Sequence, residues 1–195
     1  MKNIILLGAP RSGKSTFAKM ILKEYSNYNL IQEDVISSAY MSALKGIEFE
    51  KEENRFKDKV NIQINMNFVN KMIKAMFDFS VLYEPKLNFI LDTSGIELEE
   101  VSKYDPKNTI VLIFGYPDIT PKQGVRNVLK HDTKEDWTYI ESESNIQKLF
   151  EVYIEKSKKY KKECKRLNLK FINTSYKRRA VLNKLFDWVK VELEK

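Results

Sequence analysis

The chain has 195 residues, of which 43% are hydrophobic, 12% aromatic and 31% charged. These proportions are typical of an ordinary globular protein, and they exclude a disordered, collagen-like or coiled-coil chain. The length predicts a single domain, residues 1–195, with a substantial core. The sequence contains no run of about 18 apolar residues, so we expect no membrane-spanning helix.

The N-terminus and the single cysteine favour a cytoplasmic protein. The apolar run that ends at Leu7 passes directly into a glycine-containing loop, without the small-residue cleavage site of a signal peptide. Cys164 is the only cysteine, so it cannot form a disulfide within the chain. Because it lies on the apolar face of a predicted helix, we expect a buried thiol rather than a reactive nucleophile.

Charge is distributed unevenly along the chain, whose formal net charge is +7. Residues 1–100 contain 13 basic and 14 acidic side chains, whereas residues 101–195 contain 21 basic and 13 acidic ones. This asymmetry is compatible with a nucleic-acid or phosphate-rich partner. Only six of the 34 basic residues are arginine, however. That composition favours solvated helix faces and attraction of a polyphosphate over nucleic-acid binding.

Short apolar segments alternate with helical patterns along the whole chain. The apolar segments predict buried strands at Asn3–Leu7, Leu30–Gln32, Asn88–Asp92, Thr109–Phe114 and Lys170–Thr174. Apolar residues at helical spacing predict helices at Lys14–Ser26, Val35–Lys45, Lys51–Ser80, Gln123–Leu129, Ile146–Leu167 and Val181–Val189. This order predicts an α/β fold in which a parallel sheet lies between two helical layers. Ligands of such sheets bind beyond the carboxyl ends of the strands.

Two longer segments interrupt this alternation. Residues 35–85 are predicted to be a helical insertion, whose main helix would bury one apolar side formed by Val60, Ile64, Phe68, Met72, Ala75 and Phe79. Residues 118–145 are mostly polar and have weak periodicity apart from the short helix near Gln123. We expect this second segment to be mobile.

The loop after the first predicted strand has the pattern of a phosphate-binding loop. The pattern G-x-x-x-x-G-K-[ST] is matched by Gly8, Ala9, Pro10, Arg11, Ser12, Gly13, Lys14 and Ser15, and Thr16 follows. The glycines allow consecutive N–H groups to turn toward a polyphosphate, and the N-terminus of the next helix adds its dipole. We therefore expect Lys14 to reach the β- and γ-phosphates and Ser15 to give its hydroxyl to Mg²⁺.

Carboxylates follow the second and third predicted strands. Asp34 stands where a general base for an attacking hydroxyl is expected, with Glu33 as its immediate rival. A structural alternative for Asp34 is the N-cap of the following helix. Asp92 closes the third strand, where a carboxylate holds Mg²⁺ directly or through water. The alternative for Asp92 is an aspartate that simply begins a turn.

Several arginines are candidates for phosphate or base contacts. Arg126 is the only arginine of residues 118–145, and Arg55 is the only one of the helical insertion. Either would clamp a phosphate, and an ordinary exposed side chain is an equal alternative for both. Arg11 lies within the loop itself, and Arg178 and Arg179 follow the fifth strand, where an adenine ring can stack.

With these motifs in this order, the chain resembles the small P-loop kinases related to nucleoside monophosphate kinases. The likeness rests on GAPRSGKST at 8–16, QED at 32–34, LDTSG at 91–95 and NTS at 173–175. It implies ATP and Mg²⁺ as cofactors and a five-stranded sheet in the order 2-3-1-4-5. It also implies that residues 35–85 form an acceptor site and that residues 118–145 form a lid.

The sequence departs from adenylate kinases at two places. Thr93-Ser94-Gly95 follows Asp92 where those enzymes have Gly-Phe-Pro-Arg, and the lid segment has one arginine where they have several. The N-terminal third is more similar to the polynucleotide kinase group, which has a GxPxSGKST loop, an Asp after the second strand and an Asp-Thr pair after the third. This resemblance implies Lys14 as the loop lysine, Asp34 as general base and Arg126 as lid arginine.

Three functions are compatible with these features. The leading expectation is an ATP-dependent phosphotransferase that moves the γ-phosphoryl group to a small-molecule acceptor such as a nucleotide, a nucleoside or another hydroxyl compound. The first alternative is a polynucleotide 5′-end kinase, which the basic second half of the chain allows. The second alternative is an ATPase or switch protein without an acceptor. The sequence has no Asn-Lys-x-Asp motif, so a guanine nucleotide is not expected.

Overall fold

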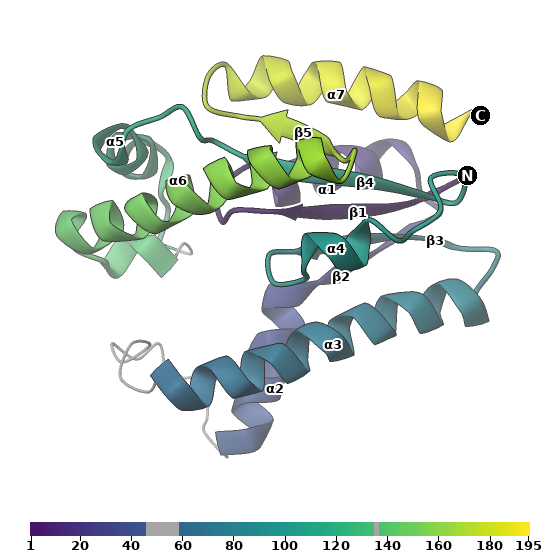
Figure 1. Ribbon diagram of the computed structural model, residues 1–195, viewed down its shortest axis with the longest axis horizontal. Helices are drawn as coiled ribbons and strands as arrows, with labels where there is room; N and C mark the ends of the chain where they lie inside the picture. The colour runs from purple at the N-terminus through teal and green to yellow at the C-terminus, as the bar shows by residue number, and fades with distance from the viewer. Residues whose placement is uncertain (46–58, 135–136) are drawn as a thin grey trace. The chain divides into compact units, whose positions relative to one another are not determined.

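The computed structural model describes residues 1–45, 59–134 and 137–195 (Figure 1). In this part of the chain, one parallel sheet has the strand order β2-β3-β1-β4-β5. The strands are β1 (Asn3–Gly8), β2 (Tyr28–Gln32), β3 (Asn88–Thr93), β4 (Thr109–Gly115) and β5 (Lys170–Asn173). The α/β class and the order 2-3-1-4-5 are therefore confirmed. Because the strands are parallel, their carboxyl ends lie along one edge of the sheet.

The helices follow the predicted alternation, with changes at their ends. They are α1 (Lys14–Glu24), α2 (Glu33–Lys45), α3 (Lys59–Tyr83), α4 (Leu98–Val101), α5 (Pro121–His131), α6 (Glu143–Arg166) and α7 (Arg178–Leu193), together with the 3-10 turn η1 (Trp137–Ile140). The four-residue helix α4 was not predicted, because so short a segment has no measurable periodicity. Each described helix is too short or too polar to cross a bilayer.

The described residues form two compact units. The first contains residues 1–7 and 18–111, and the second contains residues 8–17 and 112–195. In the first unit, β3 is hydrogen-bonded to β1 on one side and to β2 on the other. Ile4, Leu6 and Ile90 are completely buried there, as expected for strands covered on both faces.

The predicted buried side of α3 is wrong in the described residues. Val69, Ile73 and Phe77 are completely buried, whereas Phe68 and Phe79 are 56% and 55% exposed. The helix carries apolar residues on more than one face, so two helical stripes fitted the sequence equally well. Packing against the sheet, which periodicity alone does not reveal, selects the stripe that contains Phe77.

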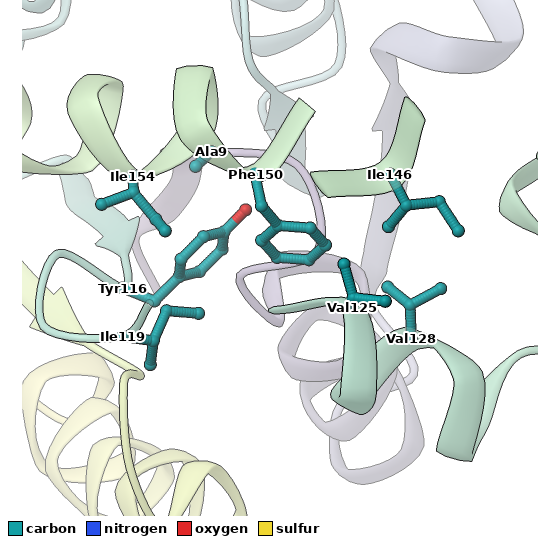
Figure 2. Close-up of a cluster of buried hydrophobic side chains, with 8 residues drawn as sticks. All are labelled: Ala9, Tyr116, Ile119, Val125, Val128, Ile146, Phe150 and Ile154. Atoms are coloured by element: carbon teal, nitrogen blue, oxygen red, sulfur yellow. The ribbon is translucent and has the colours of Figure 1, made fainter. Parts of the chain in front are cut away.

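The second unit has its own apolar cluster between α5 and α6 (Figure 2). Its members are Ala9, Tyr116, Ile119, Val125, Val128, Ile146, Phe150 and Ile154. The rings of Tyr116 and Phe150 lie 5.7 Å apart between their centroids. A Cβ atom on Gly124 would lie 2.3 Å from Phe150 Cδ1, so a glycine is needed where α5 crosses this ring.

In its described residues, the polar segment 118–145 is largely helical. A capping box begins α5, because the Thr120 hydroxyl accepts from the Gln123 N–H and the Gln123 side chain accepts from the Thr120 N–H. Pro121 is the first residue of the helix, where its missing N–H costs nothing. The predicted helix near Gln123 is thus confirmed, and it extends from Pro121 to His131.

Candidate functional site

The loop between β1 and α1 passes very close to β4. A Cβ atom on Gly8 would lie 2.2 Å from the carbonyl oxygen of Phe114, so any side chain would collide with the backbone. The Ala9 N–H donates to the same carbonyl at 3.1 Å. Gly13 has a φ of +102°, in the region that strongly favours glycine. Both glycines of the phosphate-loop pattern are therefore required by the backbone itself.

The polar groups of the loop converge at the N-terminus of α1. The buried Lys14 ammonium donates to the carbonyl oxygens of Gly8 and Ala9, each at 3.2 Å. The Ser12 hydroxyl is completely buried and has no hydrogen-bond partner within the described residues. Ser15 and Thr16 are exposed in the first turn of α1. A helix N-terminus with hydroxyls and an ammonium beside it suits an anion.

Arg11 at the apex of the loop is held by residues of the segment 118–145. Its Nη2 atom lies 2.7 Å from Asp132 Oδ1 and also donates to the Thr138 hydroxyl. The Thr138 hydroxyl in turn donates to the other carboxylate oxygen of Asp132 at 2.5 Å. Arg11 has a φ of 60°, which is unusual for a residue other than glycine.

Two further contacts fix the backbone at this apex. The Tyr116 hydroxyl donates to the Pro10 carbonyl at 2.8 Å, and Arg178 Nη1 donates to the Arg11 carbonyl at 3.2 Å. Burial raises the pKa of the Tyr116 hydroxyl well above its usual value, so this donor stays protonated at physiological pH. Hydrogen bonds from the residue after β4 and from α7 thus hold the loop.

A cavity of about 500 Å³ lies beside the loop within the second unit. Its lining includes the cationic side chains of Arg11, Arg126, Lys177 and Arg178, and His131 also faces it. This volume lies in the range of small-molecule sites, about 300–1,000 Å³. These cationic side chains in its lining favour a negatively charged ligand.

One side of the cavity is formed by residues that follow β5, and Asp118 fixes them. Its carboxylate accepts from Asn173 Nδ2 at 2.6 Å, and its backbone N–H donates to the Ser175 hydroxyl at 3.0 Å. The Tyr176 hydroxyl donates to the Asp118 carbonyl at 2.5 Å. Lys177 then adopts a left-handed conformation and precedes α7. The NTS motif at 173–175 therefore shapes the turn that leads to Arg178.

Glu33 and Asp34 are rivals in the sequence, and the structure gives them different surroundings. Glu33 is only 5% exposed, and its carboxylate accepts from the Thr93 hydroxyl at 2.5 Å. It also accepts from the N–H groups of Ser94 and Gly95. Asp34 is exposed in the first turn of α2. Glu33 therefore holds the turn after β3, whereas Asp34 is open to solvent.

Asp92 lies near the carboxyl end of β3, with its side chain buried. Its strand neighbours are Leu6 of β1 and Gln32 of β2. Asp92 therefore lies opposite Gln32, the residue directly before Glu33. The turn that follows is also bound by α3, because Asn70 Nδ2 donates to the Gly95 carbonyl at 2.8 Å.

The remaining candidates fall into different classes. Arg126 is exposed on α5 and lines the cavity, as does Arg178, whereas Arg179 is exposed without lining it. Arg55 lies outside the described residues. Cys164 is 1% exposed, and burial raises the pKa of its thiol to about 12, so the expected buried thiol is confirmed.

The roles of Glu33, Asp132 and Thr138 are not predictable from the sequence. Their partners are far away in the sequence, since Thr93 is 60 residues from Glu33 and Asp132 is 121 residues from Arg11. No local pattern marks such contacts. The sequence offers a single weak signal, namely the second acid beside Asp34.

Comparisons with solved structures find the same fold elsewhere. A shikimate kinase from Bacteroides thetaiotaomicron superimposes with a TM-score of 0.55 at 11% identity, covering 97% of this chain and 98% of that chain. A kinase candidate from Chloroflexus aurantiacus gives a TM-score of 0.54 at 11% identity, covering 99% and 96%. The Thermus thermophilus protein TT1252 gives 0.58 at 15% identity, covering 98% of both chains.

Matches at the level of sequence are absent. No protein-family model matches the chain, and no curated protein is significantly similar to it. The likeness to the solved structures therefore concerns the fold, and it extends over nearly the whole chain. The protein has the α/β fold of these proteins, with a parallel sheet in the order 2-3-1-4-5.

Proposed function

We propose that the protein is an ATP-dependent phosphotransferase that moves the γ-phosphoryl group of ATP to a small-molecule acceptor. The observation that carries this proposal is the loop Gly8–Thr16, whose two glycines are required by the backbone. The last residues of this loop form the first turn of α1. Among the proteins of the same fold, one is a shikimate kinase, a small-molecule kinase by name. A small acceptor for this chain is in line with that likeness.

The residues of the second unit fit ATP. The N-terminus of α1 supplies N–H groups and a positive dipole end for phosphates. The buried Ser12 hydroxyl, which lacks a partner in the described residues, is available as a further donor. The adjoining cavity of about 500 Å³ is large enough for the nucleoside, and Arg178 lines it where an adenine ring can stack.

Mg²⁺ would be held by Ser15 and Asp92. A hydroxyl and a carboxylate are the oxygen ligands that this ion prefers, and it commonly takes its remaining ligands from water and the phosphates of the substrate. No cluster of three or more His, Cys, Asp or Glu side chains suited to a metal is found in the described ranges. A site completed by the nucleotide agrees with that finding. When bound, the ion neutralises charge on the phosphates.

Three side chains would act on the transferred group. Lys14 would leave its two backbone carbonyls and stabilise the negative charge on the β- and γ-phosphates. Asp34 would take the proton of the acceptor hydroxyl while that oxygen bonds to the γ-phosphorus and the bond to ADP breaks. Arg126, exposed beside the cavity, would stabilise the charge from the lid segment 118–145. We assign acceptor binding to residues 35–85.

The test is a search for a phosphorylated product. The purified protein is incubated with Mg²⁺ and ATP and with pools of nucleosides, nucleotides, sugars or a 5′-hydroxyl oligonucleotide, and the products are identified by mass spectrometry. We expect a product from one small-molecule pool, its loss in Lys14→Ala and its retention in Lys19→Ala, an exposed lysine of the same helix. A product only from the oligonucleotide would indicate a polynucleotide kinase. ADP without any product would contradict the proposal.

A further inference from the structure

Asp132 is an acid in a position that does not favour one. It is the C-cap residue of α5, where the negative end of the helix dipole disfavours a carboxylate. Its side chain is only 6% exposed, so solvent does little to screen this interaction. Helix stability therefore does not explain the presence of an acid here.

The contacts of Asp132 all lead to Arg11. One carboxylate oxygen lies 2.7 Å from Arg11 Nη2, and the other accepts from the Thr138 hydroxyl, which itself accepts from Arg11. Thr138 is only 3% exposed. A guanidinium bound by a buried carboxylate and hydroxyl loses much of its rotational freedom. The three side chains form one hydrogen-bonded triangle, which we name the Arg11 triangle.

The Arg11 triangle fixes a residue of the phosphate loop at the edge of the cavity. Arg11 belongs to the loop and lines the cavity together with Arg126 and Arg178. Its backbone is left-handed, which is an unfavourable conformation for a residue other than glycine. The hydrogen bond from Arg178 to the Arg11 carbonyl stabilises this conformation at the backbone. The ion pair with Asp132 stabilises it at the side chain.

We propose that Asp132 is a positioning residue for nucleotide binding, which acts through Arg11. By holding the guanidinium at the cavity wall, Asp132 removes the need to order a long side chain when the nucleotide phosphates bind. Thr138 keeps the carboxylate aligned with Arg11. This inference rests on the proposed function only for the identity of the ligand, an adenine nucleotide.

A double-mutant cycle measured by calorimetry tests the proposal. Mg²⁺ and a non-hydrolysable ATP analogue are titrated into the wild type, Arg11→Ala, Asp132→Asn, the double variant, and the control Asp187→Asn, an exposed acid of α7. We expect each single variant at the triangle to weaken binding about tenfold, as is typical of a lost hydrogen bond to a charged group. Asp187→Asn should bind like the wild type.

The double variant distinguishes positioning from a merely structural role. If Asp132 acts through Arg11, Asp132→Asn weakens binding less than twofold once Arg11 is alanine. Should Asp132→Asn fail to fold, Thr138→Val replaces it, with a smaller loss that also disappears in the Arg11→Ala background. An undiminished loss in that background, unchanged binding, or tighter binding by Asp132→Asn would overturn the proposal.

The same titration separates this proposal from the proposed function. A wild type that binds no adenine nucleotide contradicts both. A wild type that binds the analogue but yields no phosphorylated product contradicts only the transfer reaction, and the cycle still decides the role of Asp132. A wild type that transfers phosphate, with no coupling between Arg11 and Asp132, contradicts only the positioning role.

Discussion

Glu33 and Asp34 are neighbouring acids whose removal should have opposite consequences. Glu33→Gln keeps one acceptor oxygen, but it puts an NH2 donor in place of the other and removes the negative charge that strengthens the hydrogen bonds from the turn 93–95. We expect the free energy of unfolding to fall by about 1–3 kcal/mol. Asp34→Asn changes an exposed side chain, so stability should stay within about 0.5 kcal/mol of the wild type.

For activity, in contrast to stability, we expect Asp34→Asn to be the more damaging of the two variants. We expect Asp34→Asn to lose phosphoryl transfer while keeping nucleotide binding, because only proton acceptance is removed. Urea unfolding of both variants, combined with calorimetric nucleotide titration, makes the comparison. Equal loss of binding and transfer in Asp34→Asn would point to a structural role for that residue. An unchanged stability in Glu33→Gln would show that the turn does not depend on the carboxylate.

At the scale of single residues, the sequence predicts local chemistry and misses distant partners. The phosphate-loop glycines are predicted, because a short pattern records the conformation of its own backbone, as at Gly13. The choice between Glu33 and Asp34 depends on which carboxylate meets the turn after β3. That meeting is set by strand register, in which Gln32 lies opposite Asp92, and it leaves no trace in the spacing of residues.

The packing of α5 on α6 depends on one small residue. Gly124→Ala would improve the intrinsic helix propensity of α5 by about 1 kcal/mol. The added Cβ would lie 2.3 Å from Phe150 Cδ1, and Phe150 is held in the cluster by Tyr116 and Ile146 (Figure 2). We therefore expect a net destabilisation of about 1–3 kcal/mol in urea unfolding.

A matched substitution separates propensity from packing in the same helix. Lys122→Ala lies on the exposed side of α5 and should be neutral or slightly stabilising. If Gly124→Ala is as stable as Lys122→Ala, then α5 shifts at no energetic cost, and the close contact with Phe150 does not constrain this helix.

At the scale of elements, the sequence predicts that a helix or strand is present more reliably than it predicts which face is buried or where the element ends. Strands such as Thr109–Gly115 are recognised because they are continuous apolar runs. The start of α2 was placed two residues late, because the acids at its first turn read as a loop before the helix. In α3, apolar residues lie on several faces, so the sequence does not determine which face packs in the core.

The whole molecule should lose stability in the alkaline range. Burial is the largest cause that raises the pKa values of Tyr28, Tyr104 and Tyr116 above that of a free tyrosine, and Asp78 adds to the effect at Tyr104. In the unfolded chain these hydroxyls ionise near pH 10. A raised folded-state pKa contributes stability that is complete below the unfolded pKa and is lost as the pH rises above it.

We therefore expect the free energy of unfolding to fall as the pH rises from about 9 to about 12. Urea unfolding at a series of pH values measures the slope. Tyr104→Phe removes one contributing group and should flatten the curve, although it also removes the hydrogen bond to Asp78 and lowers the stability at neutral pH. A slope that is the same in Tyr104→Phe and the wild type would contradict the assignment.

A phosphotransferase passes the γ-phosphoryl group of ATP to the acceptor, whereas an ATPase passes it to water, and one ratio distinguishes the two reactions. With the acceptor found in the product search, phosphorylated product and ADP are measured together over the same reaction. A phosphotransferase forms them in a ratio close to one, and ADP formation depends on the acceptor. ADP that forms at the same rate with and without acceptor, with little product, would contradict the account and indicate an ATPase.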